Sequence, residues 1–250
     1  MPYFELDGLK LYYEEHGSGT PLLLLQGNSA SSAHMKLTGD AAYFQQYARV
    51  ILFDYRGTGK STRLQRWPAD WYARCAQDAA MLLMELQAPP CKIIGSSGGA
   101  FIAFWLAALF PELVQAVVAE SFRLDIAHYV KELIQQTRSN YTAGQKKFWK
   151  LGHGLDWRSV IQADTAFLQR MAEEESGPIM DIPYSKIRCP VFLCGSAQDD
   201  LIPDMARQLA LAREQIPQAE VYLHESGGHP LMWSEPQIFR DKAVRFLELS

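Results

Sequence analysis

The chain has 250 residues, of which 48% are apolar and 21% charged, so it can bury a core as one α/β domain or as one domain carrying an insertion. A formal net charge of -4 and the lack of a basic run argue against nucleic acid as a partner. The start of the chain has no basic segment before an apolar one, and the longest aliphatic run, residues 22–25, is too short to cross a bilayer, so we expect a soluble cytoplasmic protein with no membrane partner.

Short apolar runs alternate with helical stretches along the first half of the chain. Asp7-Gly8 separates two strand-like segments and predicts a hairpin. The predicted strands are residues 3–5, 9–15, 22–25, 50–53, 92–94 and 116–119, and the predicted helices between them are residues 69–86 and 100–109. This alternation indicates right-handed crossovers and a mostly parallel sheet.

The strand pattern stops at residue 122 and resumes with the apolar runs at 191–194 and 221–224. Residues 122–182 contain helix-like segments with several aromatic side chains, among them Trp149, Trp157 and Phe167. We expect a helical cap at 122–182 and a core domain formed by 1–121 and 183–250. Two interpretations of the aromatic residues stay open: they pack the cap's own small core, or some of them line an apolar pocket.

The stretch K-I-I-G-S-S-G-G-A, residues 92–100, follows a predicted strand and precedes a predicted helix. A nucleophile elbow needs this context, with little room two residues before and two after the nucleophile. Gly95 and Gly99 meet that demand around Ser97. If Ser96 were the nucleophile, the branched Ile94 would occupy a crowded position. Ser97 is therefore the candidate nucleophile.

A serine nucleophile needs a histidine base and a carboxylate that orients the base. Both should follow later strands, because the carboxyl ends of parallel strands meet at one edge of a sheet. Asp199 follows the run at 191–194, and His229 follows the run at 221–224. The order Ser97, Asp199, His229 is the order of one particular fold.

These motifs resemble the α/β-hydrolase superfamily, small capped serine hydrolase (esterase/lactonase-like) branch. Residues 54–61, D-Y-R-G-T-G-K-S, are similar to the family turn D-x-R-G-x-G-x-S, which supports the site from behind. Residues 199–203, D-D-L-I-P, are similar to the acid turn D-x-x-V-P. The resemblance implies a mostly parallel central sheet flanked by helices, with a small helical cap inserted after the sixth strand.

The same resemblance assigns the acid and the base. It favours Asp199 as the acid, with Asp200 as the first alternative because the turn is one residue longer than usual. Glu120 and Asp125, after the sixth strand, are weaker alternatives. It favours His229 as the base because Pro236 and Phe239 follow at the family spacing.

One departure lies at Gln26-Gly27-Asn28, where the family often has His-Gly. The family places its two oxyanion donors on the backbone after that glycine and after the nucleophile. The resemblance therefore implies that the N–H groups of Asn28 and Gly98 form the oxyanion hole. Because both donors are main-chain groups, the change of side chain need not abolish it.

The remaining polar residues give no metal or cofactor pattern, so we expect neither. The other five histidines are scattered and are interpreted as surface or structural residues: His16, His34, His128, His153 and His224. The four cysteines are far apart and indicate reduced core thiols: Cys75, Cys91, Cys189 and Cys194. Ser234 is the expected N-cap of a final helix, with Gln237 returning to it and Pro236 in the first turn.

The function implied is a serine hydrolase that cleaves a small carboxylic ester, lactone or thioester through an acyl-enzyme on Ser97. The family's haloalkane and epoxide hydrolases use aspartate at the elbow, which argues against both. A ligand receptor with slow or no turnover, or a carbon-carbon bond hydrolase or perhydrolase, stays open as an alternative. We expect a small-molecule ester-like substrate and a monomer or homodimer.

Overall fold

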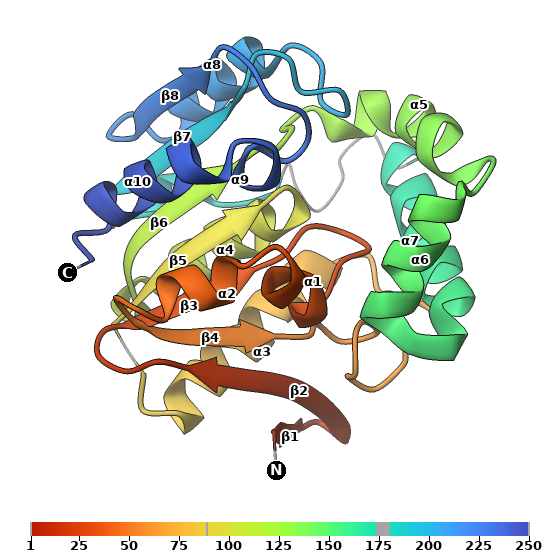
Figure 1. The fold of residues 1–250 in the computed structure, drawn as a ribbon, viewed down its shortest axis with the longest axis horizontal. Coiled ribbons are helices and arrows are strands. Elements are labelled where there is room, and N and C mark those ends of the chain that lie inside the picture. The colour runs from red at the N-terminus through yellow and green to blue at the C-terminus, as the bar shows by residue number, and fades with distance from the viewer. Residues whose placement is uncertain (1, 89, 174–180, 250) are drawn as a thin grey trace.

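A single eight-stranded sheet organises the computed structural model, which describes residues 2–88, 90–173 and 181–249. The strand order is β1-β2-β4-β3-β5-β6-β7-β8 (Figure 1). The strands are β1 (Tyr3–Leu6), β2 (Leu9–His16), β3 (Pro21–Leu25), β4 (Arg49–Phe53), β5 (Cys91–Ser96), β6 (Val114–Glu120), β7 (Val191–Ser196) and β8 (Glu220–His224). All eight runs expected from the sequence are strands.

The sheet is parallel from β4 through β3, β5, β6 and β7 to β8, whereas β2 pairs antiparallel with both of its neighbours, β1 and β4. The predicted hairpin joins β1 to β2. Asp7 and Gly8 both have positive φ, at 50° and 77°, as a tight two-residue hairpin turn requires. The carboxyl ends of the six parallel strands therefore meet along one edge, where the loops carry the candidate site.

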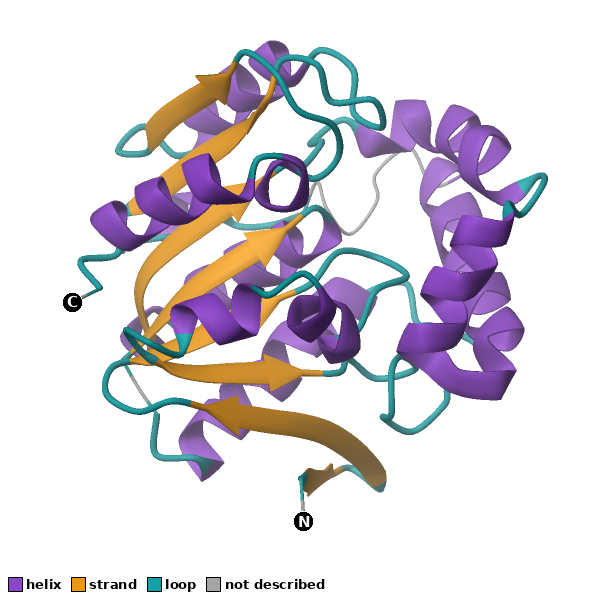
Figure 2. Cartoon of the chain, viewed as in Figure 1, coloured by secondary structure: helices purple, strands orange, loops and turns teal. Residues whose placement is uncertain are grey.

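Helices cover both faces of the sheet (Figure 2). They are α1 (Ser32–Leu37), α2 (Asp40–Phe44), α3 (Trp71–Glu85), α4 (Gly98–Leu109), α8 (Met205–Gln215), α9 (Leu231–Ser234) and α10 (Pro236–Phe246), with single 3₁₀ turns at Pro111–Leu113, Gly154–Asp156 and Tyr184–Lys186. Alternate residues of each strand face opposite layers. Leu22 and Leu24 pack with residues of α1, α2 and α10, while Leu23 and Leu25 pack with residues of α3, α4 and α8.

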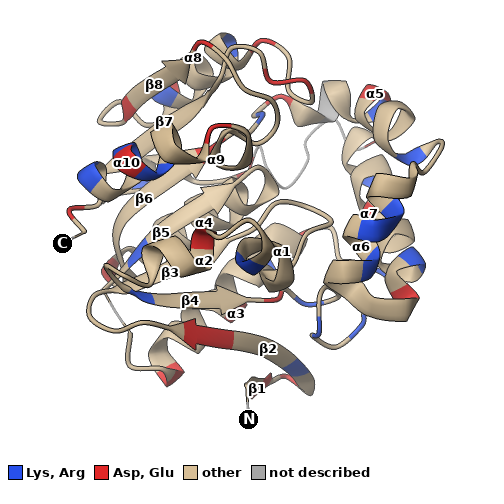
Figure 3. Cartoon of the chain, in the orientation of Figure 1, with Lys and Arg blue, Asp and Glu red and all other residues tan. Residues whose placement is uncertain are grey.

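Three helices between β6 and β7 form the cap: α5 (Ile126–Arg138), α6 (Ala143–His153) and α7 (Trp157–Glu173). They stand beyond the carboxyl ends of the strands (Figure 1). Lysine and arginine are conspicuous on α6 and α7 (Figure 3). The last part of the expected cap, residues 174–180, lies outside the described residues.

Two of the three aromatic residues named above follow the first interpretation, and the third follows neither. Trp149 and Trp157 form a small buried cluster within the cap with Ile161. Phe167 instead packs into the main core against the rings of Trp67 and Tyr72. The large aromatic side chains therefore both build the cap and bind it to the core domain.

His153, the last residue of α6, joins the cap to two core loops. Its Nδ1 accepts a hydrogen bond from the Gly59 amide (2.9 Å), and its Nε2 donates to the Ser29 carbonyl (3.0 Å). Because one ring nitrogen accepts and the other donates, the imidazole is neutral. Burial lowers the pKa of His153 to about 4.

His34 in α1 makes the reciprocal connection from the core to the cap. Its Nδ1 accepts from the Ser31 amide (3.0 Å), and its Nε2 donates to the carbonyl of Phe148 in α6 (3.0 Å). The Phe148 ring stacks on the imidazole, with 3.7 Å between the two ring centres. Burial also lowers the pKa of His34. Both histidines are structural, as expected, but they are buried cap anchors rather than surface groups.

The start of α10 differs from the expectation. Pro236 is the first residue of the helix, as predicted, but the N-cap is Glu235 and not Ser234. The Ser234 hydroxyl donates to the Gly228 and Pro230 carbonyls, and Gln237 donates to Asp241 instead of returning to the cap. The short helix α9 uses Ser234 as its own last residue, which leaves it unable to cap α10.

In the described part of the chain, no helix has both the length and the apolar character needed to cross a membrane. The four cysteines are buried and unpaired.

We predict that His153→Gln flattens the acid dependence of stability. The pKa of His153 is about 4 in the folded protein and 6.5 when unfolded, so the unfolded state takes up the proton first. The contribution of neutral His153 to the free energy of unfolding is complete above pH 6.5. It falls by roughly 3 kcal/mol as the pH decreases toward 4. Urea unfolding between pH 7.5 and 4 should show a smaller decline for the variant than for the wild type. Parallel declines would contradict the prediction.

Candidate active site

Ser97 occupies the turn between β5 and α4, where the backbone is strained. Its φ is 52° and its ψ is -119°, a combination that side-chain-bearing residues rarely adopt. Strand, sharp turn and helix follow one another as the sequence predicted. The hydroxyl lies on a cavity at the carboxyl edge of the sheet.

Neighbouring glycines make this turn sterically possible. A Cβ on Gly95 would lie 2.5 Å from the Gly99 carbonyl oxygen, and a Cβ on Gly99 would overlap the Leu25 carbonyl. Gly98 has the same restriction, because a Cβ there would overlap the side-chain oxygen of Asn28. Substitution at Gly98 or Gly99 would push the elbow away from the end of β3 and the loop that follows it, and substitution at Gly95 would push β5 away from the start of α4.

The structure brings Ser97, His229 and Asp199 together. His229 Nε2 lies 3.1 Å from Ser97 Oγ, and its Nδ1 lies 2.9 Å from Asp199 Oδ2. The side chain of Asp199 is fully buried and that of His229 is 11% exposed. With Nδ1 protonated and donating to the carboxylate, Nε2 is free to accept the serine proton.

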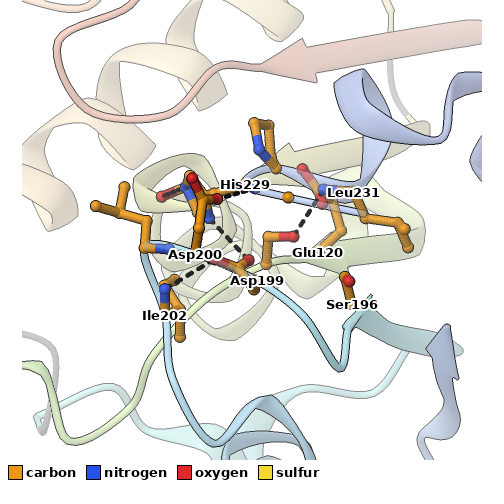
Figure 4. A network of polar contacts seen from close by, with 12 residues as sticks. Glu120, Ser196, Asp199, Asp200, Ile202, His229 and Leu231 are labelled. Atoms are coloured by element: carbon orange, nitrogen blue, oxygen red, sulfur yellow. Dashed lines mark hydrogen bonds and ion pairs between the residues drawn. The ribbon is translucent and has the colours of Figure 1, made fainter. Parts of the chain in front are cut away.

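Two backbone amides hold the carboxylate in this orientation. Asp199 Oδ1 accepts from the amides of Leu201 (3.0 Å) and Ile202 (2.7 Å), which leaves Oδ2 for the imidazole (Figure 4). Asp200 faces away from the ring. Its Oδ1 accepts from the backbone amide of His229 (2.8 Å) and so fixes the loop that carries the base.

The two weaker acid candidates have other partners. Asp125 pairs with Arg123 and Arg207. Glu120 is fully buried, and its carboxyl is bonded to the hydroxyl of Ser96, the residue before the candidate nucleophile. Neither one occupies the Nδ1 side of the imidazole.

Glu120 lies in a network that connects the elbow to the base loop. Its carbonyl accepts from the Ser97 amide (2.9 Å). The hydroxyl of the next residue, Ser121, accepts from the Leu231 amide (3.0 Å), two residues after His229. Burial raises the pKa of the Glu120 carboxyl to about 7. The end of β6 thus bonds both to the turn that carries Ser97 and to the loop that carries His229.

Asn28 and Gly98 both line the cavity beside Ser97. The position of a Cβ on Gly98 is 3.1 Å from the Asn28 nitrogen. Neither amide donates to another group in the part of the chain that the structure describes. The Asn28 side chain is held by the hydroxyl of Tyr72, which donates to its Oδ1 (3.0 Å). Two fixed main-chain donors are therefore available beside Ser97.

Gln26, which replaces the family's histidine, supports this loop from below. Its side-chain amide donates to the Phe53 carbonyl (2.9 Å), and its own carbonyl accepts from Tyr55 (2.8 Å). The turn at 54–61 also supports this side of the site. Asp54 accepts from the amides of Ser32 (2.7 Å) and Lys60 (2.8 Å), so it holds the turn to α1.

A cavity of about 200 Å³ adjoins Ser97 and extends under the cap. Most of its lining is apolar, and it includes Phe101, Leu133, Phe148 and Leu168. Sequence reasoning did not single out Tyr72 or Arg138, which also line it. The only sequence signal that could have identified these two residues is a polar side chain on an otherwise apolar face of a helix.

Of the other histidines, His16 pairs with Glu14, and His224 contacts Tyr222 and Ser226. His34 and His153 anchor the cap, as described. The side chain of His128 lies outside the described residues.

Comparison with known proteins agrees with the architecture. The family model described as "alpha/beta hydrolase fold" matches residues 20–139. The RutD protein of Azorhizobium caulinodans is 24% identical, over 98% of this chain and 98% of the relative.

Two solved structures share the fold at 20% identity. An esterase from Exiguobacterium antarcticum superposes with a TM-score of 0.76 over 97% of each chain. An N-acyl homoserine lactone degrading enzyme superposes with a TM-score of 0.75, over 98% of this chain and 100% of the other.

We predict that Asp199→Asn lowers kcat on an activated ester by on the order of 10⁴-fold, because the amide no longer enforces the productive imidazole tautomer. Asp200→Asn is the matched control. Its side-chain oxygen can still accept from the His229 amide, so activity should stay within about tenfold of the wild type. Steady-state kinetics on both variants measure the difference, and equal losses would contradict it.

We further predict that Glu120→Gln alters the pH dependence of stability. The carboxyl has a pKa of 4.5 when unfolded and about 7 when folded, so the folded state retains its proton longer. The wild type therefore loses stability, on the order of 3 kcal/mol, as the pH rises from 4.5 through 7. Urea unfolding at pH 5 and pH 8 should show that the amide variant lacks this loss. An equal loss in both proteins would count against a protonated Glu120.

Proposed function

We propose that this chain, which belongs to the α/β-hydrolase superfamily, is a serine hydrolase that cleaves a small carboxylic ester, lactone or thioester through an acyl-enzyme on Ser97. The observation that carries the proposal is the continuous contact from Ser97 Oγ through His229 to Asp199, at 3.1 and 2.9 Å. That chain of groups can activate a hydroxyl at neutral pH.

In the first half of the reaction, Ser97 Oγ attacks the substrate carbonyl carbon while its proton moves to His229 Nε2. The Asp199 carboxylate stabilises the imidazolium that forms. The carbonyl oxygen becomes an oxyanion and accepts hydrogen bonds from the amides of Asn28 and Gly98. The imidazolium then protonates the departing alcohol or thiol, which leaves an acyl group on Ser97.

In the second half, a water molecule takes the place of the leaving group. His229 accepts a proton from the water as it attacks the acyl carbonyl, and the same two amides stabilise the second oxyanion. Collapse returns the proton to Ser97 and releases the acid. Each step uses groups already in contact, so no additional cofactor is required by the proposal.

The cavity supports a small substrate. About 200 Å³ of space under an apolar roof suits a short acyl or alcohol group better than a long lipid chain. One of the two structural relatives is an esterase and the other is an N-acyl homoserine lactone degrading enzyme, which is consistent with this class. The cap excludes water from the oxyanion and so strengthens its hydrogen bonds.

A fluorophosphonate probe should label the wild type at Ser97, and Ser97→Ala should lose both labelling and turnover of p-nitrophenyl esters. His229→Ala should lower kcat by on the order of 10³-fold or more, because the triad acts as a unit. Ser96→Ala is the matched control and should keep most of the activity. Peptide mapping by mass spectrometry identifies the modified residue.

Labelling that survives in Ser97→Ala would refute the nucleophile. If p-nitrophenyl esters acylate the protein once per molecule and no further turnover follows, a ligand receptor is favoured over an enzyme.

A further inference from the structure

Arg138, the last residue of α5, is one of the residues that line the cavity. Its side chain is only 10% exposed. Nη2 donates to Asp164 Oδ2 of α7 (2.8 Å), and the guanidinium lies 5.2 Å from the centre of the Trp149 ring. The ion pair and the ring together fix the orientation of this cation.

The hydrogen bonds of this ion pair are incomplete. A guanidinium has five N–H donors, and Arg138 uses Nη2 alone on the described residues. Its Nε is buried with no described acceptor, and Asp164 Oδ1 is buried with no described donor. Leaving buried donors unpaired is costly, so their retention at a cavity wall calls for an explanation.

The charge around Arg138 selects the kind of acceptor. Asp164 is fully buried and already balances the guanidinium. A substrate carboxylate at this place would add a second negative charge without a second cation, at a large desolvation cost. A neutral oxygen would satisfy a donor without disturbing the balance.

The other arginine on the cavity has its partners. The Nε of Arg123, before α5, also lacks a hydrogen bond of good geometry, but it lies 2.7 Å from Asp125 Oδ1 in an ion pair, and Nη1 donates to the Pro203 carbonyl (3.2 Å). The helix of 13 residues between the two arginines spans about 20 Å, so they serve opposite ends of the cavity roof. Among the described residues, Arg138 therefore has one hydrogen-bonding partner, Asp164, whereas Arg123 has a carboxylate and a backbone carbonyl.

We infer that Arg138 is a specificity-determining residue, which binds a neutral hydrogen-bond acceptor, such as a ketone, amide or ether oxygen, on the substrate some distance from the scissile carbonyl. This inference rests on the proposed function and narrows its substrate class. The apolar wall formed by Phe101, Leu133 and Leu168 accommodates the methylene groups between the two oxygens.

The test compares p-nitrophenyl esters of matched length. The 5-oxohexanoate, 6-oxoheptanoate and 7-oxooctanoate are paired with the hexanoate, heptanoate and octanoate, and with the monoesters of the diacids of equal length. For at least one length, the wild type should show kcat/KM about tenfold higher for the ketone than for the alkyl ester, the effect of one hydrogen bond to a charged donor. The carboxylate should be slower than the ketone.

Arg138→Met combined with Asp164→Asn removes both charges and should bring the ketone-to-alkyl ratio close to one. If the double variant does not fold, Arg138→Lys takes its place in the test. It keeps the charge beside Asp164 but loses the planar fork of donors, so it should lower the ketone-to-alkyl ratio severalfold. Arg158→Met, on the exposed face of α7, is the matched control and should leave the ratio unchanged.

A ratio near one at every length in the wild type would overturn the inference, as would a preference that persists in the double variant. Faster turnover of the carboxylate would overturn the neutrality of the acceptor. The proposed function is judged separately, because the unsubstituted alkyl esters must be hydrolysed by the wild type and not by Ser97→Ala.

Discussion

The left-handed turn at Ser97 is the constraint on which the site depends. A non-glycine residue at φ 52° is unfavourable by itself and persists only where the surroundings determine it. Here the surroundings are backbone atoms: the carbonyls of Leu25 and Gly99 lie where Cβ atoms on Gly99 and Gly95 would be. The same close approach brings the amide of Gly98 beside that of Asn28, so one steric arrangement both exposes the hydroxyl and assembles two donors.

The network behind the triad is built from groups with different tasks. Asp199 orients the base, whereas Asp200 and Ser121 hold the backbone of the base loop through its amides. Glu120 bonds to the hydroxyl before the nucleophile and has its pKa raised by burial. Below about pH 7, protonation of Glu120 avoids a second negative charge close to Asp199, which would compete for the imidazolium.

The cap is joined to the core by polar contacts as well as by apolar packing. His34 bonds to Ser31 of the core with one ring nitrogen and to Phe148 of the cap with the other. His153 of the cap uses both ring nitrogens on core loops, and one of them reaches the carbonyl of Ser29, next to the candidate oxyanion donor. Cap position and oxyanion geometry are therefore linked. The Arg138–Asp164 pair adds a polar contact to a roof that is otherwise apolar, and this contact is the basis of the specificity proposed for Arg138.

The sequence by itself determined the elements whose signals are local. Strand and helix periods located all eight strands, α3 and α4, and the glycine spacing around Ser97 identified the elbow, because steric limits at a sharp turn act within a few residues. Motif spacing also placed Asp199 and His229 at strand ends, which topology must bring together. The family turn favoured Asp199 over Asp200, and Asp199 is the carboxylate that lies on the Nδ1 side of the ring. Only the tertiary structure decided which aromatic residues serve the cap and which serve the core, that Ser234 ends α9 instead of capping α10, and that His153, Tyr72 and Arg138 meet the loops of the site. Those contacts join residues tens of positions apart, and their partners are backbone carbonyls, amides and buried charges that leave no pattern in the sequence.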